Sequence, residues 1–529
     1  MSLPNRNNPY TFDEFLEWRN SFDYYCDDSF LQQAIKYYAK NEWKHIDEEA
    51  RKISPKVSFR WKDLSEKIAQ PENRPFLMHY DGHHHRIDRI VRPHEIEVME
   101  KEVFGEALFS SQTSPWVKLI KMFLIYQNGE SCIACPLTCT EGLVEILEAH
   151  NNSPEIQNIL THCKEGIDGD FGIGAQYLSE IQGGSDVPAN LLEAVYENDT
   201  WRLYGTKFFC SAAHADYAIV TAKPTNSEKI AVFVIPSWLD KSKEQRNHFT
   251  IDRLKWKMGT SELPTGEITF NGAIAYPVGP LERGLANVVG IVLTYSRLTV
   301  GLSAAASMTR VAREARKYAE FRKAFGLPIA QFPMVELQLQ RIENHARRTT
   351  AGALKIYKLF LDHKKKMKAK KTSKVSLKNK KDQFNIRELI MLQKITASFD
   401  SMNVIREAMS IFGGHGVMED FSSLPRLFRD AAVNELWEGP RNVLLFQIYK
   451  DIKRAASWYP PIEFVRSLIK GANSQNMKYF EQQTEQFMNE DLTQMTDHAI
   501  YRNHEWSLFC QNLITEYQLH ALAEIEECD

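Results

Sequence analysis

One acidic side chain has the surroundings that a strong base needs. Glu438 follows Trp437 and precedes Gly439-Pro440, in the segment Asp-Ala-Ala-Val-Asn-Glu-Leu-Trp-Glu-Gly-Pro-Arg-Asn that ends at Asn442. An aromatic neighbour and a glycine allow a carboxylate to lie in a dry, tight corner, where it becomes a stronger base. Such a carboxylate can remove a proton next to a carbonyl group. By itself, a glutamate at a helix end is more often structural, so this prediction depends on the rest of the chain.

A second candidate site is the glycine-rich segment that ends in Gly184-Ser185. Glycine lets a backbone approach a ligand closely, and exposed N–H groups together with a serine hydroxyl can hold a pyrophosphate. Leu178 and Ser179, at the end of a predicted strand, can offer hydrogen bonds to a flat heterocycle. About twenty residues later, Phe209 and Ser211 add an aromatic platform and a hydroxyl. Without this context, Gly-Gly-Ser-Asp is more often an ordinary turn.

These residues fall in segments of different hydrophobic periodicity. Residues 10–165 are mostly helical in pattern, beginning with Thr11 as a predicted helix cap. Residues 170–280 consist of short β-branched and aromatic runs between Asn, Asp, Gly and Pro turns, which predicts antiparallel strands. The helical period returns in 284–456, where long runs with short connections predict an antiparallel bundle, and continues through 461–529. Helix, strand and helix in succession predict segregated layers and an α+β fold.

Composition excludes several classes of protein. The chain has 529 residues, 43% of them hydrophobic and 25% charged, with a net charge of −3, as in ordinary globular proteins of several domains. No uninterrupted apolar run is long enough to span a bilayer, and the best candidate, 288–308, contains Arg297. The first thirty residues carry six acidic side chains and no apolar core, which argues against a signal or transit peptide. A cytoplasmic location is therefore expected.

Three other features are open to a functional and a structural interpretation. Cys132, Cys135 and Cys139 could begin a metal site, but no fourth ligand is close in sequence, so packed free thiols and no metal are expected. The three histidines at 83–85 predict a polar turn. Residues 364–381 contain ten lysines, which could attract nucleic acid or anionic lipid, although a solvated insertion between two helices is favoured.

Five motifs occur in a fixed order between about residues 95 and 456. They are Ser-Glu-x4-Ser-Asp, Gly-x-Lys-x-Phe-x-Ser, Arg-x2-Phe-Gly, Gly-Gly-x-Gly and Arg-Asp followed by Trp-Glu-Gly. In this order they resemble the acyl-CoA dehydrogenase superfamily. Gln182 before the Gly-Gly-Ser-Asp turn, the Trp-Glu-Gly ending and the long flanking segments resemble its AidB-type (alkylation-response) branch most.

This resemblance implies a fold and an assembly. The expected regions are a mostly helical N-terminal extension, an N-terminal α domain, a middle antiparallel β-barrel, a C-terminal four-helix bundle and an extra helical segment, at 1–94, 95–168, 169–282, 283–456 and 457–529. A homo-oligomer is implied, as a dimer of dimers (homotetramer).

The resemblance also implies FAD, bound between barrel and bundle. The residues expected on its ring and pyrophosphate are Leu178, Ser179, Gly184, Ser185, Phe209, Ser211, Trp437 and Asn442. Those expected to reach the flavin of a neighbouring subunit are Arg322, Phe325, Gly413 and Gly414. Ser185 and Arg297 are expected on the substrate side.

The implied reaction is the α,β-dehydrogenation of an acyl-CoA thioester. Glu438 would remove the α-proton while the β-hydrogen leaves as hydride to flavin N5, with electron-transfer flavoprotein or oxygen as acceptor. Pro333, Ser410 and Pro440 stand where the family often has glutamine, glutamine and threonine, and the AidB-type members turn over feebly.

A flavoprotein that mainly binds or senses a fatty acyl ligand is therefore the alternative. A DNA-associated protein is disfavoured, because residues 461–529 hold four basic and twelve acidic side chains.

Overall fold

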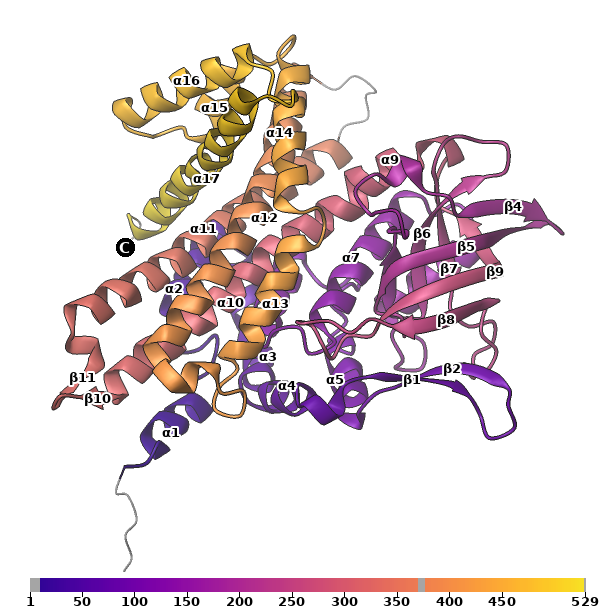
Figure 1. Cartoon of the computed structure of the whole chain (residues 1–529), viewed down its shortest axis with the longest axis horizontal. Helices are drawn as coiled ribbons and strands as arrows, with labels where there is room; N and C mark the ends of the chain where they lie inside the picture. The colour runs from indigo at the N-terminus through magenta and orange to yellow at the C-terminus, as the bar shows by residue number, and fades with distance from the viewer. Residues whose placement is uncertain (1–9, 370–375, 528–529) are drawn as a thin grey trace, which may run out of the picture.

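The structure of the protein is a computed structural model that describes residues 10–369 and 376–527. The protein consists of N-terminal helices, a β-barrel and a bundle of long helices. The last helices pack on the side of the bundle that faces away from the barrel (Figure 1). The predicted α+β fold class, with its helical, barrel and bundle regions, is confirmed.

The N-terminal helices are mostly short and are interrupted by one hairpin. They are α1 (Asp13–Ser21), α2 (Ser29–Ala39), α3 (Trp43–Pro55), α4 (Lys62–Ile68), α5 (His94–Phe104), α6 (Pro115–Tyr126), α7 (Ala134–Ala149) and α8 (Pro154–Glu165).

The sequence prediction differs from the structure at two points in this region. The predicted cap at Thr11 is wrong: the residue before α1 is Phe12, and no side chain caps the helix. The two acids of its first turn, Asp13 and Glu14, still favour the positive end of the helix dipole. The hairpin of β1 (Phe76–Tyr80) and β2 (Arg86–Val91) was not predicted, and the three histidines lie in its exposed turn.

The middle region is a closed barrel. Its strands are β3 (Gly174–Tyr177), β4 (Glu193–Glu197), β5 (Thr200–Ser211), β6 (Tyr217–Pro224), β7 (Ala231–Pro236), β8 (Phe249–Leu254) and β9 (Thr265–Pro277). The ring runs β6-β4-β5-β9-β7 and closes from β7 onto β6, while β3 pairs with β6 and β8 with β9. Most pairs are antiparallel as predicted, but β3 and β4 each lie parallel to β6. Between these strands and β6 the chain runs back along β5, antiparallel to β4, so β6 can run parallel to β3 and β4.

The bundle consists of α10 (Leu293–Phe321), α11 (Pro333–Lys368), α12 (Leu377–Phe412), α13 (Leu424–Leu436) and α14 (Arg441–Ala455). The short helix α9 (Gly284–Asn287) lies between the barrel and the bundle. The short strands β10 (Lys323–Ala324) and β11 (Leu327–Pro328) lie between α10 and α11.

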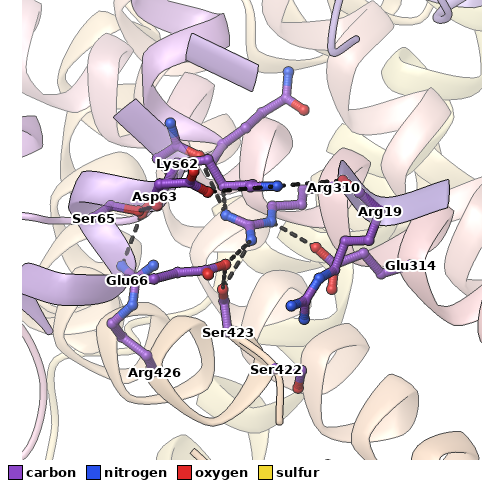
Figure 2. A network of polar contacts seen from close by, with 12 residues as sticks. Arg19, Lys62, Asp63, Ser65, Glu66, Arg310, Glu314, Ser422, Ser423 and Arg426 are labelled. Atoms are coloured by element: carbon purple, nitrogen blue, oxygen red, sulfur yellow. Dashed lines mark hydrogen bonds and ion pairs between the residues drawn. The ribbon is translucent and has the colours of Figure 1, made fainter. Parts of the chain in front are cut away.

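A buried arginine on α10 ties the bundle to the N-terminal layer (Figure 2). Arg310 Nε lies 2.8 Å from Glu314 Oε1, and its Nη2 donates to Ser423 Oγ at 2.8 Å and approaches Glu66 of α4 at 3.6 Å. The guanidinium is almost fully buried, and paired acids together with hydroxyl and carbonyl acceptors offset the cost of its desolvation. Because Ser423 directly precedes α13, this network also fixes the start of that helix.

The C-terminal segment is part of the folded body. It forms α15 (Pro461–Leu468), α16 (Ser474–Asn489) and α17 (Asp497–Glu526). Trp506 Nε1 donates to Leu445 O of α14 at 3.0 Å, and Tyr38 Oη of α2 donates to Ala521 O of α17 at 3.0 Å. The acidic C-terminal helix therefore lies against both the bundle and the first helices of the chain.

Two sequence features can be placed on this fold. The lysine-rich stretch runs from the end of α11 into α12, and Lys364 and Lys381 form ion pairs with Glu145 and Glu463, while 370–375 lie outside the described residues. One helical stretch in the described chain, Leu281–Phe321, has the length and composition of a membrane span, but 61% of its most apolar window is buried inside the protein. It serves as a core helix of the bundle.

Candidate active site

A cavity of about 600 Å³ lies between the barrel, α7, α10 and the turn that joins α13 to α14. Most of its lining is apolar, with a few polar groups, which is the usual character of a cofactor or ligand site. The structure brings together many of the residues singled out from the sequence. Those on the cavity wall are Leu178, Ser179, Gly184, Ser185, Phe209, Ser211, Arg297, Trp437 and Glu438.

Glu438 stands in the turn between two helices. The helix α13 ends at Leu436, Pro440 precedes α14, and Glu438 itself has φ of 58°, an unusual value for a residue other than glycine. Because it borders the cavity, its side chain keeps partial exposure although protein surrounds it. No hydrogen bond from the described residues ends on its carboxylate. The carboxylate is therefore free to accept a proton from a molecule in the cavity.

The charge state of Glu438 is set by opposing influences. Burial raises the pKa of its carboxyl, whereas the nearby cations Arg297 and Lys394 act to lower it. The net result is a pKa above the usual carboxyl range, which makes the carboxylate a stronger base. Arg297 also donates from Nε to the backbone carbonyl of Glu438 at 3.0 Å. Its Nε is thus bonded to the turn that carries the candidate base.

The loop after β3 is held by a buried ion pair. Lys207 Nζ lies 2.7 Å from Glu180 Oε1 and also donates to the carbonyl of Leu178 at 3.2 Å. Glu180 accepts the backbone N–H groups of Leu191 and Leu192 at 2.6 and 3.1 Å. The Ser-Glu and Gly-x-Lys motifs of the sequence are therefore two halves of one contact. This contact fixes the edge that carries Leu178 and Ser179.

A close approach of Ser179 favours glycine at position 184. A Cβ atom there would lie 2.3 Å from Ser179 Oγ and 3.2 Å from Ser179 Cβ. Across the cavity mouth, Phe209 keeps 54% of its surface exposed, and Ser211 Oγ lies 3.2 Å from Thr265 Oγ1. A flat ring system could stack on the phenyl face while the backbone at 184 and the hydroxyl groups bind its polar edge. These residues fit an isoalloxazine ring.

A buried acidic cluster forms another part of the cavity wall. Glu130 and Asp430 line the cavity, Glu262 lies next to them, and Lys257 donates to Thr260 and Thr265 at 2.8 and 2.9 Å. Burial and mutual repulsion raise the pKa values of Glu130 and Asp430.

Asp430 also joins separate parts of the chain through the backbone. Its carboxylate accepts the N–H groups of Thr260 and Glu130 at 2.7 and 3.2 Å. The aspartate of the Arg-Asp motif thus docks α13 onto the barrel and onto the turn that precedes α7.

Several predicted residues lie away from the cavity. Phe325, in the turn between β10 and β11, is 97% exposed, and the guanidinium of Arg322 stacks on Tyr10. Open space surrounds Gly413 and Gly414. Asn442, the second residue of α14, accepts the N–H of Val443 at 2.9 Å, and like the residues above it is absent from the cavity wall.

Sequence reasoning missed Lys394, Lys257 and Glu130. For Lys257 the local signal was Gly259, since a glycine can mark a close approach of the backbone; in the structure a Cβ there would lie 2.2 Å from the backbone oxygen of Arg429. Lys394 had no local signal, since it belongs to a long helical run.

The three cysteines that are close in sequence lie in the protein interior. Cys132, Cys135 and Cys139 are buried, and the last two sulfur atoms are 3.9 Å apart. Cys132 lies with Glu100 and His214 in a group whose ligand atoms are within 4.8 Å of one another. Arg92 Nη1 is 2.5 Å from Glu100, and His214 Nε2 is 2.7 Å from it. Because a guanidinium already supplies positive charge to the carboxylate, the group is best described as a buried ion-pair network.

Comparisons with known proteins agree with this architecture. Residues 175–273 match the family model for the acyl-CoA dehydrogenase middle domain, and residues 282–453 match the model for the acyl-CoA dehydrogenase C-terminal domain. The two matches together cover just over half of the chain. These domains define a class of proteins built from a β-barrel and a helical bundle. The chain belongs to the acyl-CoA dehydrogenase superfamily.

Individual relatives are more distant. Acyl-CoA dehydrogenase family member 11 of Caenorhabditis elegans is 26% identical over 446 residues, which are 80% of this chain and 70% of the relative. The putative acyl-CoA dehydrogenase AidB of Escherichia coli (strain K12) is 24% identical over 424 residues, 77% and 74% of the two chains. The solved structure of Caenorhabditis elegans ACDH-11 in complex with C11-CoA superposes with a TM-score of 0.80 at 22% identity, covering 94% of this chain and 87% of that one. At this identity, the superposition shows the shared fold.

Proposed function

We propose that the protein is an FAD-dependent acyl-CoA dehydrogenase in which Glu438 is the catalytic base. The observation that carries the proposal is the position of Glu438: its carboxylate, free of hydrogen bonds from the described residues, borders the same cavity as Ser179, Ser185 and Phe209. In this family FAD, when bound, supplies the two-electron acceptor. The chain supplies position, a mostly apolar environment and a base.

The residues of the chain divide the work between two walls. On the barrel side, Leu178, Ser179 and Ser185 bind the polar edge of the flavin, while Phe209 and Ser211 flank its ring. On the bundle side, Glu438 takes the α-proton of the thioester. Arg297, bonded to the carbonyl of Glu438, is positioned to stabilise the ionised carboxylate before the reaction. The mostly apolar lining excludes water from this proton transfer.

The predicted residues outside the cavity support an oligomer. Phe325, Arg322, Gly413 and Gly414 lie at the tips of the bundle, where the family residues at these positions reach a neighbouring subunit's flavin. An aromatic ring that is 97% exposed is costly to leave in water and is suited to a partner surface. A homo-oligomer with shared flavin sites, as a dimer of dimers, is part of the proposal.

An anaerobic titration of the purified yellow protein with acyl-CoAs of increasing length tests the proposal. We expect the flavin absorbance to bleach, and Glu438→Gln to retain the flavin while losing reduction by about 10²–10⁴-fold, the usual share of a general base. Glu435→Gln is the matched control, because it makes the same change one helical turn earlier at a side chain that does not line the cavity. Reduction of the Glu438→Gln protein at the wild-type rate would refute the role of Glu438.

A second function is favoured by one comparison. The relative with a TM-score of 0.80 was solved in complex with C11-CoA, which is evidence of binding. Pro440 also removes a hydroxyl that the family often has after Glu-Gly. Under this alternative the protein binds or senses a fatty acyl-CoA with weak or no turnover. Tight binding in the same titration without bleaching at any chain length would favour it.

A further inference from the structure

The turn that carries Glu438 has a strained backbone. Glu438 has φ of 58° and Gly439 has φ of 98°, so two successive residues adopt left-handed conformations. A residue with a Cβ atom pays an energetic penalty in this region and stays there only when its surroundings fix it. Pro440 follows and has no N–H group with which to bond the turn. Contacts from other elements must therefore hold the conformation.

Two buried cations supply those contacts. Lys394, on α12, donates from Nζ to the carbonyl oxygens of Glu435 at 2.9 Å and Gly439 at 2.8 Å. Arg297, on α10, donates to the carbonyl oxygen between them, that of Glu438. Lys394 is fully buried, so its ammonium has been taken out of water to make these bonds. Hydrogen bonds and neighbouring charges offset the cost of burying an ammonium, and here both bonds go to the turn that carries Glu438.

We infer that Lys394 is the positioning residue of the base: it clamps the backbone on both sides of Glu438 and, with Arg297, holds the carboxylate towards the cavity. This inference rests on the proposed function, in which Glu438 removes the α-proton. Lys394 does not line the cavity, so it would not contact a substrate or a flavin bound there. Its effect on the reaction is exerted through Glu438.

The charges around the turn give the clamp a second consequence. Lys394 faces Glu438, Glu435 and Arg297, and burial lowers its pKa to about 7. Arg297 in turn interacts electrostatically with Arg387, Glu388 and Asp451. While Lys394 is charged it helps to keep Glu438 ionised, whereas a neutral amine still has two N–H groups for the two carbonyls. Removing the amine altogether removes both the charge and the bonds.

Lys394→Met in the flavin-loaded protein tests the inference. We expect the amide hydrogens of residues 435–440, of which Pro440 has none, to exchange about tenfold faster, the size expected when two hydrogen bonds are lost. We expect flavin reduction in a single turnover to slow by about 10²-fold, with acyl-CoA affinity nearly unchanged, because a misplaced base slows chemistry and leaves binding intact. The acid limb of the rate against pH should move to higher pH, since Glu438 loses a neighbouring cation.

Two further variants sharpen the result. Lys62→Met is the matched control, because Lys62 is also a buried lysine that donates to a backbone carbonyl, that of Arg19, but lies in the network of Figure 2 away from the cavity. It should leave exchange at 435–440 and the acid limb as in the wild type. Lys394→Arg keeps the charge but changes the bonding geometry, so exchange should rise while the acid limb stays in place. This variant carries the test if Lys394→Met does not fold.

The outcomes separate the inference from the proposed function. Wild-type exchange at 435–440 in Lys394→Met, or in Lys394→Arg if only that variant folds, would overturn the clamp. An unshifted acid limb in Lys394→Met would overturn its electrostatic part. If no acyl-CoA bleaches the wild-type flavin, the proposed dehydrogenase fails, and the exchange measurement still decides whether Lys394 holds the turn.

Discussion

Breaking the buried pair between Lys207 and Glu180 should weaken both the fold and flavin binding. Lys207 is fully buried and Glu180 is 4% exposed. In Lys207→Met, Glu180 keeps two backbone N–H donors but loses its counter-ion at 2.7 Å, and the Leu178 carbonyl loses a donor. Truncating one partner of a buried pair costs about 3–5 kcal/mol. The edge that carries Leu178 and Ser179 should loosen with it.

The assay is chemical unfolding followed by tryptophan fluorescence, with flavin retention measured on the same samples. Lys207→Met should unfold at lower denaturant and lose flavin, whereas Lys207→Met combined with Glu180→Gln should recover about 1–3 kcal/mol, because no unpaired charge remains. Lys52→Met, which removes a surface ion pair between the exposed Lys52 and the half-buried Glu49, should change stability very little. If the double variant is no more stable than Lys207→Met, the reasoning from an uncompensated buried carboxylate is refuted.

Two more predictions follow from groups outside the cavity. Burial holds the pKa of Glu388 well above its usual value, and neither oxygen has a hydrogen-bond partner among the described residues, so the native state loses stability as pH rises above the unfolded carboxyl pKa. At pH 8 the free energy of unfolding of Glu388→Met should therefore exceed that of the wild type by about 1–3 kcal/mol, and at pH 5 by less. An equal difference at both pH values would contradict this. Phe325→Ser should change the free energy of unfolding by no more than about 0.5 kcal/mol, because the ring is exposed. It should nevertheless shift sedimentation towards smaller species and weaken flavin binding. Unchanged sedimentation would remove Phe325 from the interface.

Local patterns predicted much of the architecture. The β-branched runs of the middle region became β5, β6 and β7, and the long helical runs became α10 and α11, because strand and helix periodicity reflects burial on one face of an element. The cap at Thr11 and the hairpin β1–β2 were misjudged. Both segments make contacts with distant elements that local sequence does not reveal: Phe12 packs against Phe421, and Asp88 of β2 accepts the N–H of Ile251 in β8.

The spacing of the motifs predicted the candidate site residues, because the chemistry of glycine, serine and acidic side chains follows from the residue type itself. Only the tertiary structure decided how they are held. Glu180 needs Lys207, Glu130 meets Asp430 across 300 residues, and Lys394 reaches the turn of Glu438 from another helix. Contacts of this kind depend on how whole elements pack, and a helical run contains no local mark that distinguishes a clamping lysine from a solvated one.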